Sequence, residues 1–209
     1  MCRLRPPLLV LALLTLFVNC YGQNQSLRAD ERPDISIRRI DFLNSAYHTM
    51  ICTKELGKQG IGSVVQLQGG EFKNDDVYYG IVDNKVVYGD VNGDGQEDAL
   101  VHIGCGEAIA NFGYSELFIY TLQNGHPSLL AGFDDDRMER EYHRFYPRDL
   151  LWRITDDGVS VANGNLVITR FAGGSHACPK SVVTFEYHVA RRQLQLNHRP
   201  RKRPAGLPC

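Results

Sequence analysis

Pairs of Asp or Asn with glycine divide the second half of the chain into short apolar runs, and this pattern limits the fold most strongly. Asn124-Gly125, Asp157-Gly158 and Asn163-Gly164 each separate runs rich in β-branched and aromatic residues. Such pairs are typical of β-hairpin turns, because both residue types tolerate a positive φ. Asp83-Asn84 is interpreted as a further turn between two runs. The pattern therefore predicts antiparallel hairpins.

The predicted fold class is mainly β, a single domain with an antiparallel sheet of hairpins and one or two short helices. Residues 134–146 are the clearest helical segment, and their many charges predict a solvent-facing helix or an insertion loop. Residues 35–49 fit either an extended segment or a short helix. No unit of 20–50 residues repeats, which argues against a solenoid or a propeller. The expected strands are residues 63–67, 76–82, 85–88, 98–103, 116–122, 128–131, 152–154, 159–161, 166–171, 181–188 and 193–196.

The first 22 residues have the composition of a secretory signal peptide. Arg3 and Arg5 precede an apolar run over residues 8–18, and polar residues follow Gly22. A basic start, a short apolar stretch and a small-residue exit are typical of a cleaved signal. The apolar run is shorter than the about 20 residues that a membrane-spanning helix needs. We therefore expect cleavage after Gly22 or Cys20, and an extracytoplasmic protein, periplasmic or secreted, without a transmembrane span.

Cys20 offers an alternative, in which the mature protein begins with a lipid-modified cysteine. A lipid there would make the protein membrane-anchored instead of soluble. The residue before a lipidated cysteine is normally small, whereas Asn19 stands here. Lipidation is therefore the less favoured interpretation.

The remaining chain is expected to contain three parts. Residues 23–37 form a polar lead-in, residues 38–196 the single mainly-β domain, and residues 197–209 a basic tail. The tail has few apolar residues, so it is expected to be flexible. Its four cations are followed by no further charge, and the domain before it is acidic. No basic face is expected, and nucleic acid is not expected as a partner.

Four cysteines lie beyond the predicted signal, which suggests disulfides in an oxidising compartment. Four cysteines allow three pairings, and the sequence does not decide between them. Cys105 and Cys178 both border predicted strands, so we expect them to form the first pair. Cys52 is then expected either to pair with Cys209 or to leave that terminal cysteine free.

A candidate metal loop lies between two predicted strands. Its five candidate ligands follow the pattern D-x-N-x-D-G-x-x-D and are Asp90, Asn92, Asp94, Gln96 (through its carbonyl) and Asp98. Calcium prefers six to eight oxygen ligands, so alternate oxygens around a tight turn suit it. The pattern predicts a structural calcium ion. The alternative is a bare turn in which the Asx side chains accept backbone hydrogen bonds.

The loop resembles the calcium loops of dockerins and of the FG-GAP blades of integrin-type propellers. It differs from a complete EF-hand, because Val101 stands where the bidentate glutamate would be. A strand is expected after the loop in place of a helix.

A wider resemblance rests on the order of several motifs. The chain resembles a family of exported bacterial proteins of unassigned function, similar to the LppP/LprE-type lipoproteins. The resemblance implies an exported location and a similar fold, and it implies no activity. Ala177 stands where the family often has a second cysteine, and many members have degraded versions of the acidic loop. The matching segments are residues 40–44, 70–72, 88–105, 119–131, 157–168, 173–179 and 184–187.

No catalytic set is found in the sequence. It contains no HExxH, CxxC, GxSxG or Walker motif. His102, His176 and His188 are isolated and are interpreted as structural, and the three acids at 134–136 are not expected to share one site. The favoured function is a non-enzymatic extracytoplasmic module that binds an envelope protein or a glycan, or has a structural role, with calcium holding one loop. The alternative is a secreted hydrolase with an acidic active site.

Overall fold

A computed structural model describes residues 36–110, 113–190 and 193–206. The predicted signal peptide, nearly all of the polar lead-in, Cys20 and Cys209 lie outside these residues. Among the helices within these ranges, none has the length and apolar character needed to cross a membrane.

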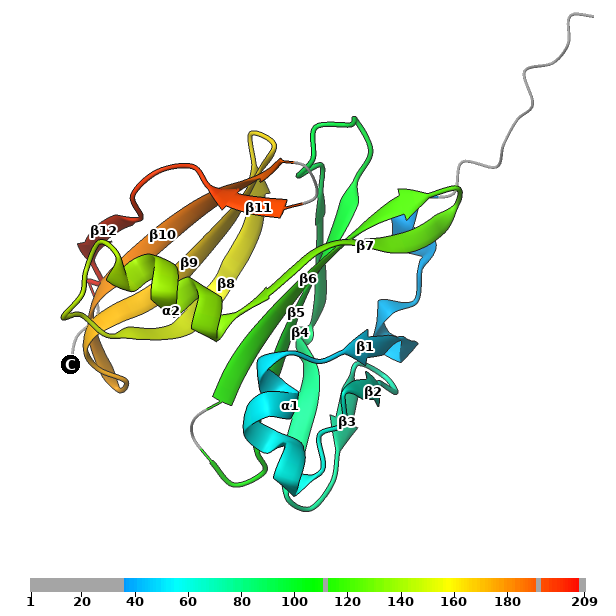
Figure 1. The fold of residues 1–209 in the computed structure, drawn as a ribbon, viewed down its shortest axis with the longest axis horizontal. Coiled ribbons are helices and arrows are strands. Elements are labelled where there is room, and N and C mark those ends of the chain that lie inside the picture. Colours follow the sequence, from blue (N-terminus) through cyan, green and yellow to red (C-terminus); the bar gives the residue numbers. More distant parts are fainter. Residues whose placement is uncertain (1–35, 111–112, 191–192, 207–209) are drawn as a thin grey trace, which may run out of the picture. The chain divides into compact units, whose positions relative to one another are not determined.

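The described chain is built mainly from β-strands, as predicted, with two short α-helices (Figure 1). Three single turns of 3-10 helix, η1, η2 and η3, occur near the start. In chain order the elements are η1 (Ile37–Arg39), η2 (Phe42–Asn44), β1 (Ala46–His48), α1 (Ile51–Leu56), η3 (Gly57–Gln59), β2 (Val64–Gln66), β3 (Glu71–Lys73), β4 (Val77–Gly89), β5 (Asp98–Glu107), β6 (Gly113–Gln123), β7 (His126–Asp134), α2 (Asp135–His143), β8 (Leu151–Ala162), β9 (Asn165–Ser175), β10 (Cys178–Ala190), β11 (Gln193–Leu196) and β12 (Arg201–Pro204).

The strands form two large antiparallel sheets. The first sheet has the order β3-β4-β5-β6-β7, and each strand pairs with its neighbour in the sequence. The second sheet has the order β11-β10-β9-β8. Strand β12 also pairs with β10. A small ribbon of β1 and β2 lies apart from both. This meander of adjacent strands is the topology that the hairpin pattern predicts.

The first sheet is buried on both faces. One face packs against α1 and the N-terminal segment, in a core that includes Tyr47, Tyr79 and Phe118. The other face packs against α2 and the second sheet, in a core that includes Leu117 and Phe185. Strand β5 lies in the middle of this sheet, which explains why it is apolar on both sides along most of its length.

The Asx-Gly pairs have two different roles. Asn124-Gly125 and Asn163-Gly164 have positive φ at both residues and make two-residue hairpin turns, as predicted. Asp83-Asn84 and Asp157-Gly158 were expected to be turns, and this is wrong. Both halves of β4 pair with β5, and both halves of β8 pair with β9, so each pair is a bulge within one long strand.

The helix predicted near residues 134–146 is present as α2, but the expectation that it faces solvent is wrong. Met138 and Tyr142 are buried, and the Tyr142 ring lies 6.2 Å from that of Phe185 on β10. Figure 1 shows α2 lying over β8, β9 and β10. Its charges project around a narrow apolar stripe, which is why a count of charges alone misjudged its burial.

The two sheets approach each other closely where β4 passes β8. A Cβ atom on Gly89 would lie 2.7 Å from the Cβ atom of Val161. Such an approach leaves no room for a side chain at this position, so glycine is required there.

Candidate functional site

A cleft of about 520 Å³ opens between the two sheets, along the part of β4 that precedes Gly89. The lining of the first sheet includes Tyr78, Val82 and His102. Strand β8 contributes residues 151–159, and α2 contributes three acidic residues, at 135, 136 and 139. Ligand pockets typically have volumes of about 300–1,000 Å³ and mixed apolar and polar linings, so this cleft has the dimensions of a small-molecule site.

The inner wall of the cleft holds a buried ion pair. Arg170 on β9 is 3% exposed, and its Nη1 donates to Oδ1 of Asp135 at 2.5 Å. The Nε atom of Arg170 donates to the carbonyl of Trp152 at 2.6 Å. The amide of Ser115 donates to the second oxygen of Asp135 at 2.7 Å. Burial raises the pKa of Asp135, whereas Arg170 and the amide of Ser115 oppose that rise. The pair thus joins α2 to both sheets.

His102 lines the cleft, and one of its ring nitrogens has no hydrogen-bond partner among the described residues. Its Nε2 atom is buried and makes no hydrogen bond to any described residue. Burial and the nearby Arg170 lower the pKa of His102 to about 4, so the ring is neutral at physiological pH. A buried nitrogen of this kind costs free energy unless a water molecule or a ligand satisfies it. The interpretation of His102 as a structural histidine stays a prediction.

Aromatic side chains form part of the cleft surface. Trp152 lines it, and its indole nitrogen donates to the carbonyl of Gly173 at 3.0 Å. His176 lies edge-on to the Trp152 ring, with 5.8 Å between ring centroids. Tyr78, on the facing wall, is 36% exposed. The cleft therefore presents ring surfaces on both of its walls.

Most of the acidic side chains that line the cleft are already neutralised. Asp136 pairs with Lys54 at 2.7 Å, and Asp157 on β8 pairs with Lys85 on β4 at 2.5 Å. Within the described ranges, Asp83 and Glu139 are the lining carboxylates without a recorded ion pair. As expected from the sequence, the three acids at 134–136 do not share one site. Asp134 caps α2 by accepting from the amide of Arg137, whereas Asp135 and Asp136 pair with Arg170 and Lys54.

The predicted calcium loop folds as a chain of Asx hydrogen bonds. The carboxylate of Asp90 accepts from the amides of Gly93 and Gly95, at 2.6 and 2.9 Å. Asn92 accepts from the amide of Asp94 at 2.8 Å. Asp94 in turn accepts from the amide of Gln96 at 2.8 Å. Asx hydrogen bonds of this kind are those that the bare-turn alternative expected.

Asp98 closes the loop and is fully buried. It accepts from the amide of Val91 at 2.9 Å and from the side chain of Asn92 at 3.3 Å. Burial raises the pKa of Asp98, and the charges of Asp90 and Asp94 raise it further. The three carboxylates thus repel one another across the loop.

The described residues contain no group of three or more His, Cys, Asp or Glu side chains arranged to hold one metal ion. Side-chain oxygens of Asp90, Asn92, Asp94 and Asp98 accept hydrogen bonds from backbone amides. Calcium binding by Asp90, Asn92, Asp94, Gln96 and Asp98 therefore stays a prediction.

An arginine outside the loop holds it in place. Arg38 donates from Nε and Nη2 to both carboxylate oxygens of Glu97, at 2.6 and 2.7 Å. Its guanidinium also lies 4.4 Å from the centre of the Tyr88 ring. Bidentate pairs of this type fix geometry as well as charge, so the loop is tied to the N-terminal segment.

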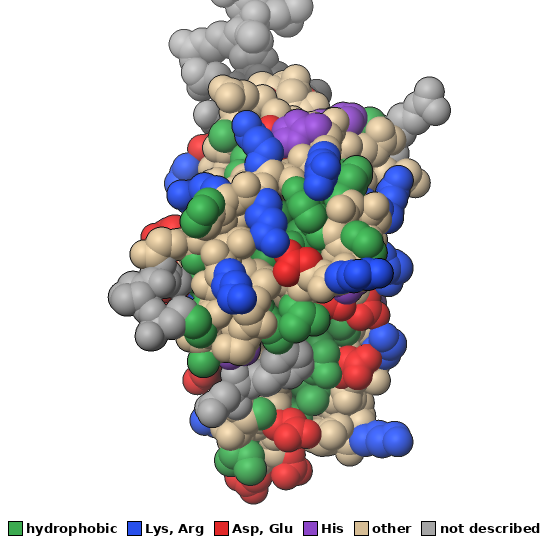
Figure 2. All heavy atoms as spheres, turned by 90° about the vertical axis from the view of Figure 1, so that its left-hand side faces the viewer, with side chains coloured by type: hydrophobic (Ala, Val, Ile, Leu, Met, Phe, Trp, Pro, Cys, Tyr) green, Lys and Arg blue, Asp and Glu red, His purple; other side chains and the backbone are tan. Residues whose placement is uncertain are grey.

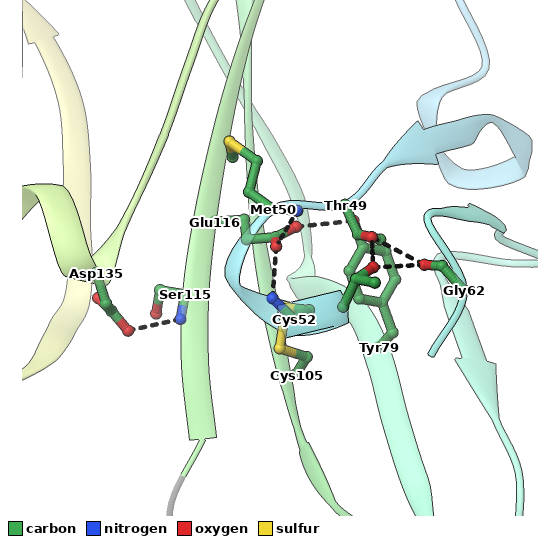
Figure 3. The surroundings of a disulfide bond; sticks show 10 residues. Thr49, Met50, Cys52, Gly62, Tyr79, Cys105, Ser115, Glu116 and Asp135 are labelled. Carbon is green, nitrogen blue, oxygen red and sulfur yellow. Dashed lines mark hydrogen bonds between the residues drawn. A yellow bond between two sulfur atoms is a disulfide. The ribbon is translucent and has the colours of Figure 1, made fainter. Parts of the chain in front are cut away.

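One disulfide joins Cys52 on α1 to Cys105 on β5, with 6.0 Å between their Cα atoms (Figure 3). A disulfide was predicted and is present, but the expected pairs Cys105–Cys178 and Cys52–Cys209 are wrong. Cys105 belongs to the face of the first sheet that packs on α1, whereas Cys178 begins β10 of the second sheet. Alternation along β5 therefore turns the Cys105 side chain away from Cys178, which takes part in another disulfide.

A buried carboxylate lies beside this disulfide. Glu116 on β6 is fully buried, and its Oε1 accepts from the amides of Met50 and Cys52, at 2.6 and 2.8 Å (Figure 3). Its Oε2 accepts from the hydroxyl of Tyr79 at 3.1 Å. The N-cap position of α1, Met50, has no side chain able to cap, so Glu116 supplies the cap from a distant strand.

The C-terminal residues are more ordered than the sequence predicts. Arg201–Pro204 form β12, which pairs with Ser181–Thr184 of β10. Arg201 forms an ion pair with Glu186, and Lys202 forms one with Asp149. The expectation of a flexible tail over residues 197–209 is therefore wrong for this strand, because cations in the tail find carboxylates on the second sheet.

The sequence analysis assigned no site role to the residues that line the cleft. Arg170, Trp152 and Asp135 belong to no motif, and only the fold brings them together. The available signal for Arg170 was that it is the single charged residue in the run 166–171. An inward-facing charge on a strand usually has a buried partner.

Comparison with known proteins gives no relative from which a role could be transferred. No protein-family model, no curated protein and no solved structure matches this chain.

Proposed function

We propose that this chain is a non-enzymatic extracytoplasmic binding protein, which holds a small hydroxyl-rich ligand such as a glycan fragment in the cleft between its sheets. The observation that carries the proposal is a cleft with aromatic walls that is lined by His102, whose buried Nε2 atom has no partner among the described residues. The N-terminal sequence supports export, and the Cys52–Cys105 disulfide is typical of an oxidising compartment.

The lining favours a ligand with both apolar and polar surfaces. Trp152 and Tyr78 offer ring faces against which the C–H face of a sugar can pack. A ligand that reaches His102 would satisfy its unpartnered Nε2 atom, and Asp83 and Glu139 offer carboxylate oxygens that accept from hydroxyl groups. Such a combination of packing surface and a few placed polar groups is what gives a pocket its specificity.

Replacing His102 with leucine is expected to weaken ligand binding by about 10- to 100-fold, because one hydrogen bond in a buried site is worth about 1–3 kcal/mol. Trp152 is the only tryptophan and lines the cleft, so its fluorescence reports occupancy. We would titrate the purified protein with a panel of mono- and disaccharides. The same change should leave the melting temperature unchanged or higher, since it removes a buried nitrogen without a partner.

His126→Leu is the matched control, because His126 is exposed on β7 and does not line the cleft. It should bind as tightly as the unaltered protein. The proposal would be wrong if no saccharide changed the Trp152 fluorescence, or if both histidine variants bound equally well.

The alternative of a secreted hydrolase rests on the acids of the cleft. Both oxygens of Asp135 are occupied, by Arg170 and by the Ser115 amide, so it is poorly placed to transfer a proton. Glu139 is the remaining candidate on α2. Release of new reducing ends from the same saccharide panel, lost in Glu139→Gln, would favour this alternative over simple binding.

We further propose that the acidic loop takes up calcium as a structural ion. The mutual repulsion of Asp90, Asp94 and Asp98 supports this, because a cation would relieve it. Each carboxylate oxygen that accepts one amide keeps a second lone pair for a ligand bond. The bound ion would fix the connection between β4 and β5.

Calcium at ten times its dissociation constant should add about 1.4 kcal/mol to the free energy of unfolding. For a chain of this size this raises the melting temperature by about 4 °C. Extracellular modules bind calcium at about 0.1–1 mM, so thermal melting in 10 mM calcium and in chelator tests the effect. Asp94→Ala should abolish the shift, whereas Asp75→Ala, an exposed acid outside the loop, should keep it. Equal melting curves with calcium and with chelator would leave the loop a bare turn.

A further inference from the structure

The charges of this chain divide between its two sheets. Residues 36–134, which include the first sheet, contain 13 acidic and six basic side chains. Residues 135–206, which include α2 and the second sheet, contain eight acidic and 13 basic side chains. The sequence was interpreted as an acidic domain with a basic tail and no basic face, and the fold corrects this. The packed tail joins other cations on the second sheet.

The outer margin of the second sheet carries a cluster of cations, which we call the basic edge: Lys180, Arg199, Arg201, Lys202 and Arg203. All four residues of β12 are exposed, and so are Lys180 and Arg199. The register pairs Val182 with Arg203, so Lys180 lies on the same side of the sheet as Arg203. Figure 2 faces this margin and shows Lys and Arg side chains spread over its upper part, with Asp and Glu gathered mainly below.

Tyr146 holds the basic edge against the sheet. Its ring lies 4.6 Å from the guanidinium of Arg199 and 5.6 Å from the Nζ atom of Lys202. Its hydroxyl donates to the carbonyl of Pro200 at 2.9 Å. Lys202 on β12 and Arg199, which precedes this strand, are therefore held in fixed positions.

Only part of the positive charge is neutralised within the molecule. Arg201 and Lys202 have carboxylate partners, Glu186 and Asp149. In the described part of the chain, Lys180 and Arg203 have no recorded ion pair. The edge thus keeps a net positive charge that an external anion can meet.

The structure favours a phosphate-bearing lipid surface over a nucleic acid as the partner. Single-stranded nucleic acids need exposed aromatic rings for stacking, whereas the Tyr146 ring is covered by Arg199 and lies 4.9 Å from that of Tyr142. No helix presents the cations to a groove, because they lie on a strand edge. Leu150, which follows the Lys202 partner Asp149, is 52% exposed and can enter the headgroup layer.

We propose that the basic edge docks this protein on the anionic headgroups of a phospholipid membrane. The acidic first sheet would then face away from the negative surface, which orients the molecule. This contact needs no occupant in the cleft, so it is independent of the ligand proposed there. Each Lys or Arg near such a surface contributes about 1 kcal/mol at physiological ionic strength.

The purified exported protein is tested by co-sedimentation with vesicles of phosphatidylcholine containing 30% phosphatidylglycerol, in roughly 0.1 M salt. We expect binding that is absent with pure phosphatidylcholine and is lost in 1 M salt, where the screening length falls to about 3 Å. Lys180→Glu combined with Arg203→Glu should weaken binding at least about 30-fold, the effect of removing two such cations.

Lys58→Glu combined with Lys73→Glu is the matched control, since it changes the net charge equally on exposed residues before the second sheet. This control variant has the same N-terminus as the other proteins tested, and it should bind the vesicles as tightly as the unaltered protein does. Melting curves of both double variants check that they fold. Equal loss of binding in the two variants, or no binding to anionic vesicles, would overturn the proposal. So would binding to soluble inorganic polyphosphate without binding to vesicles, which would point to a polymer.

Discussion

Replacing Glu116 with alanine is expected to lower the free energy of unfolding by about 4 kcal/mol. The carboxylate satisfies two buried amides, of Met50 and Cys52, and the buried hydroxyl of Tyr79. A buried polar group left without a partner costs about 1–3 kcal/mol. Helix α1 has one and a half turns and no cap of its own, so it loses its fixed start when the carboxylate is removed. Urea unfolding of the purified protein measures the loss.

Glu116→Gln separates the role of the shape from that of the charge. The amide oxygen of glutamine can accept from both backbone amides, because both bond to Oε1. The amide nitrogen can donate to the Tyr79 oxygen, which is also able to accept. We therefore expect a loss of less than about 1.5 kcal/mol relative to the unaltered protein.

The two side chains also differ in their response to pH. Burial raises the pKa of Glu116 above its usual value of about 4.5. Its contribution to stability is therefore complete below that value and is lost as the pH rises through the pKa of the folded state. The free energy of unfolding should fall as the pH rises above 4.5, and Glu116→Gln should make this fall smaller. Asp98 and Asp135, whose pKa values are also raised, contribute to the fall in the same direction.

Glu107→Ala is the control, because Glu107 is an exposed acid at the end of β5 and should change stability little. If Glu116→Ala unfolded at the same urea concentration as Glu107→Ala, the carboxylate would not be the cap of α1. If Glu116→Gln kept the full pH dependence, the raised pKa would belong to another group.

Local patterns in the sequence were sufficient to predict the fold class. Asn124-Gly125 and Asn163-Gly164 specify hairpin turns, because these residues adopt positive φ without help from distant groups. Asp83-Asn84 has the same local conformation but lies within β4. Its role as a bulge depends on the pairing of both flanking segments with β5. A strand partner is a property of the whole sheet, which a window of a few residues does not contain.

The candidate site could not be predicted in the same way, because its contacts are long-range. Arg170 and Asp135 are 35 residues apart, and Glu116 caps an amide 64 residues away. Alternation on a strand indicates which side chains share a face, and it does not indicate which other element covers that face. This also explains the incorrect pairing of Cys105. Its place beside a strand was recognised, but the face on which it lies was decided by the packing of α1.

Removing the Cys52–Cys105 disulfide is expected to lower the free energy of unfolding by about 4 kcal/mol. The two cysteines are 53 residues apart, and the value follows from the entropy that such a closed loop removes from the unfolded chain. For a chain of this length the loss corresponds to a melting temperature lower by roughly 8–16 °C. The variant Cys52→Ala with Cys105→Ala is suitable, because both sulfurs are fully buried and alanine introduces no polar atom.

Truncating two buried side chains also leaves a cavity, so the variant alone does not isolate the cross-link. The unaltered protein and the double variant are therefore each unfolded with and without reductant. Reductant also opens the disulfide of Cys178, and its effect on the double variant measures that contribution separately. The extra loss in the unaltered protein is the contribution of Cys52–Cys105. If reductant destabilised both proteins equally, the bond between α1 and β5 would contribute nothing, and Glu116 and apolar packing alone would hold α1 in place.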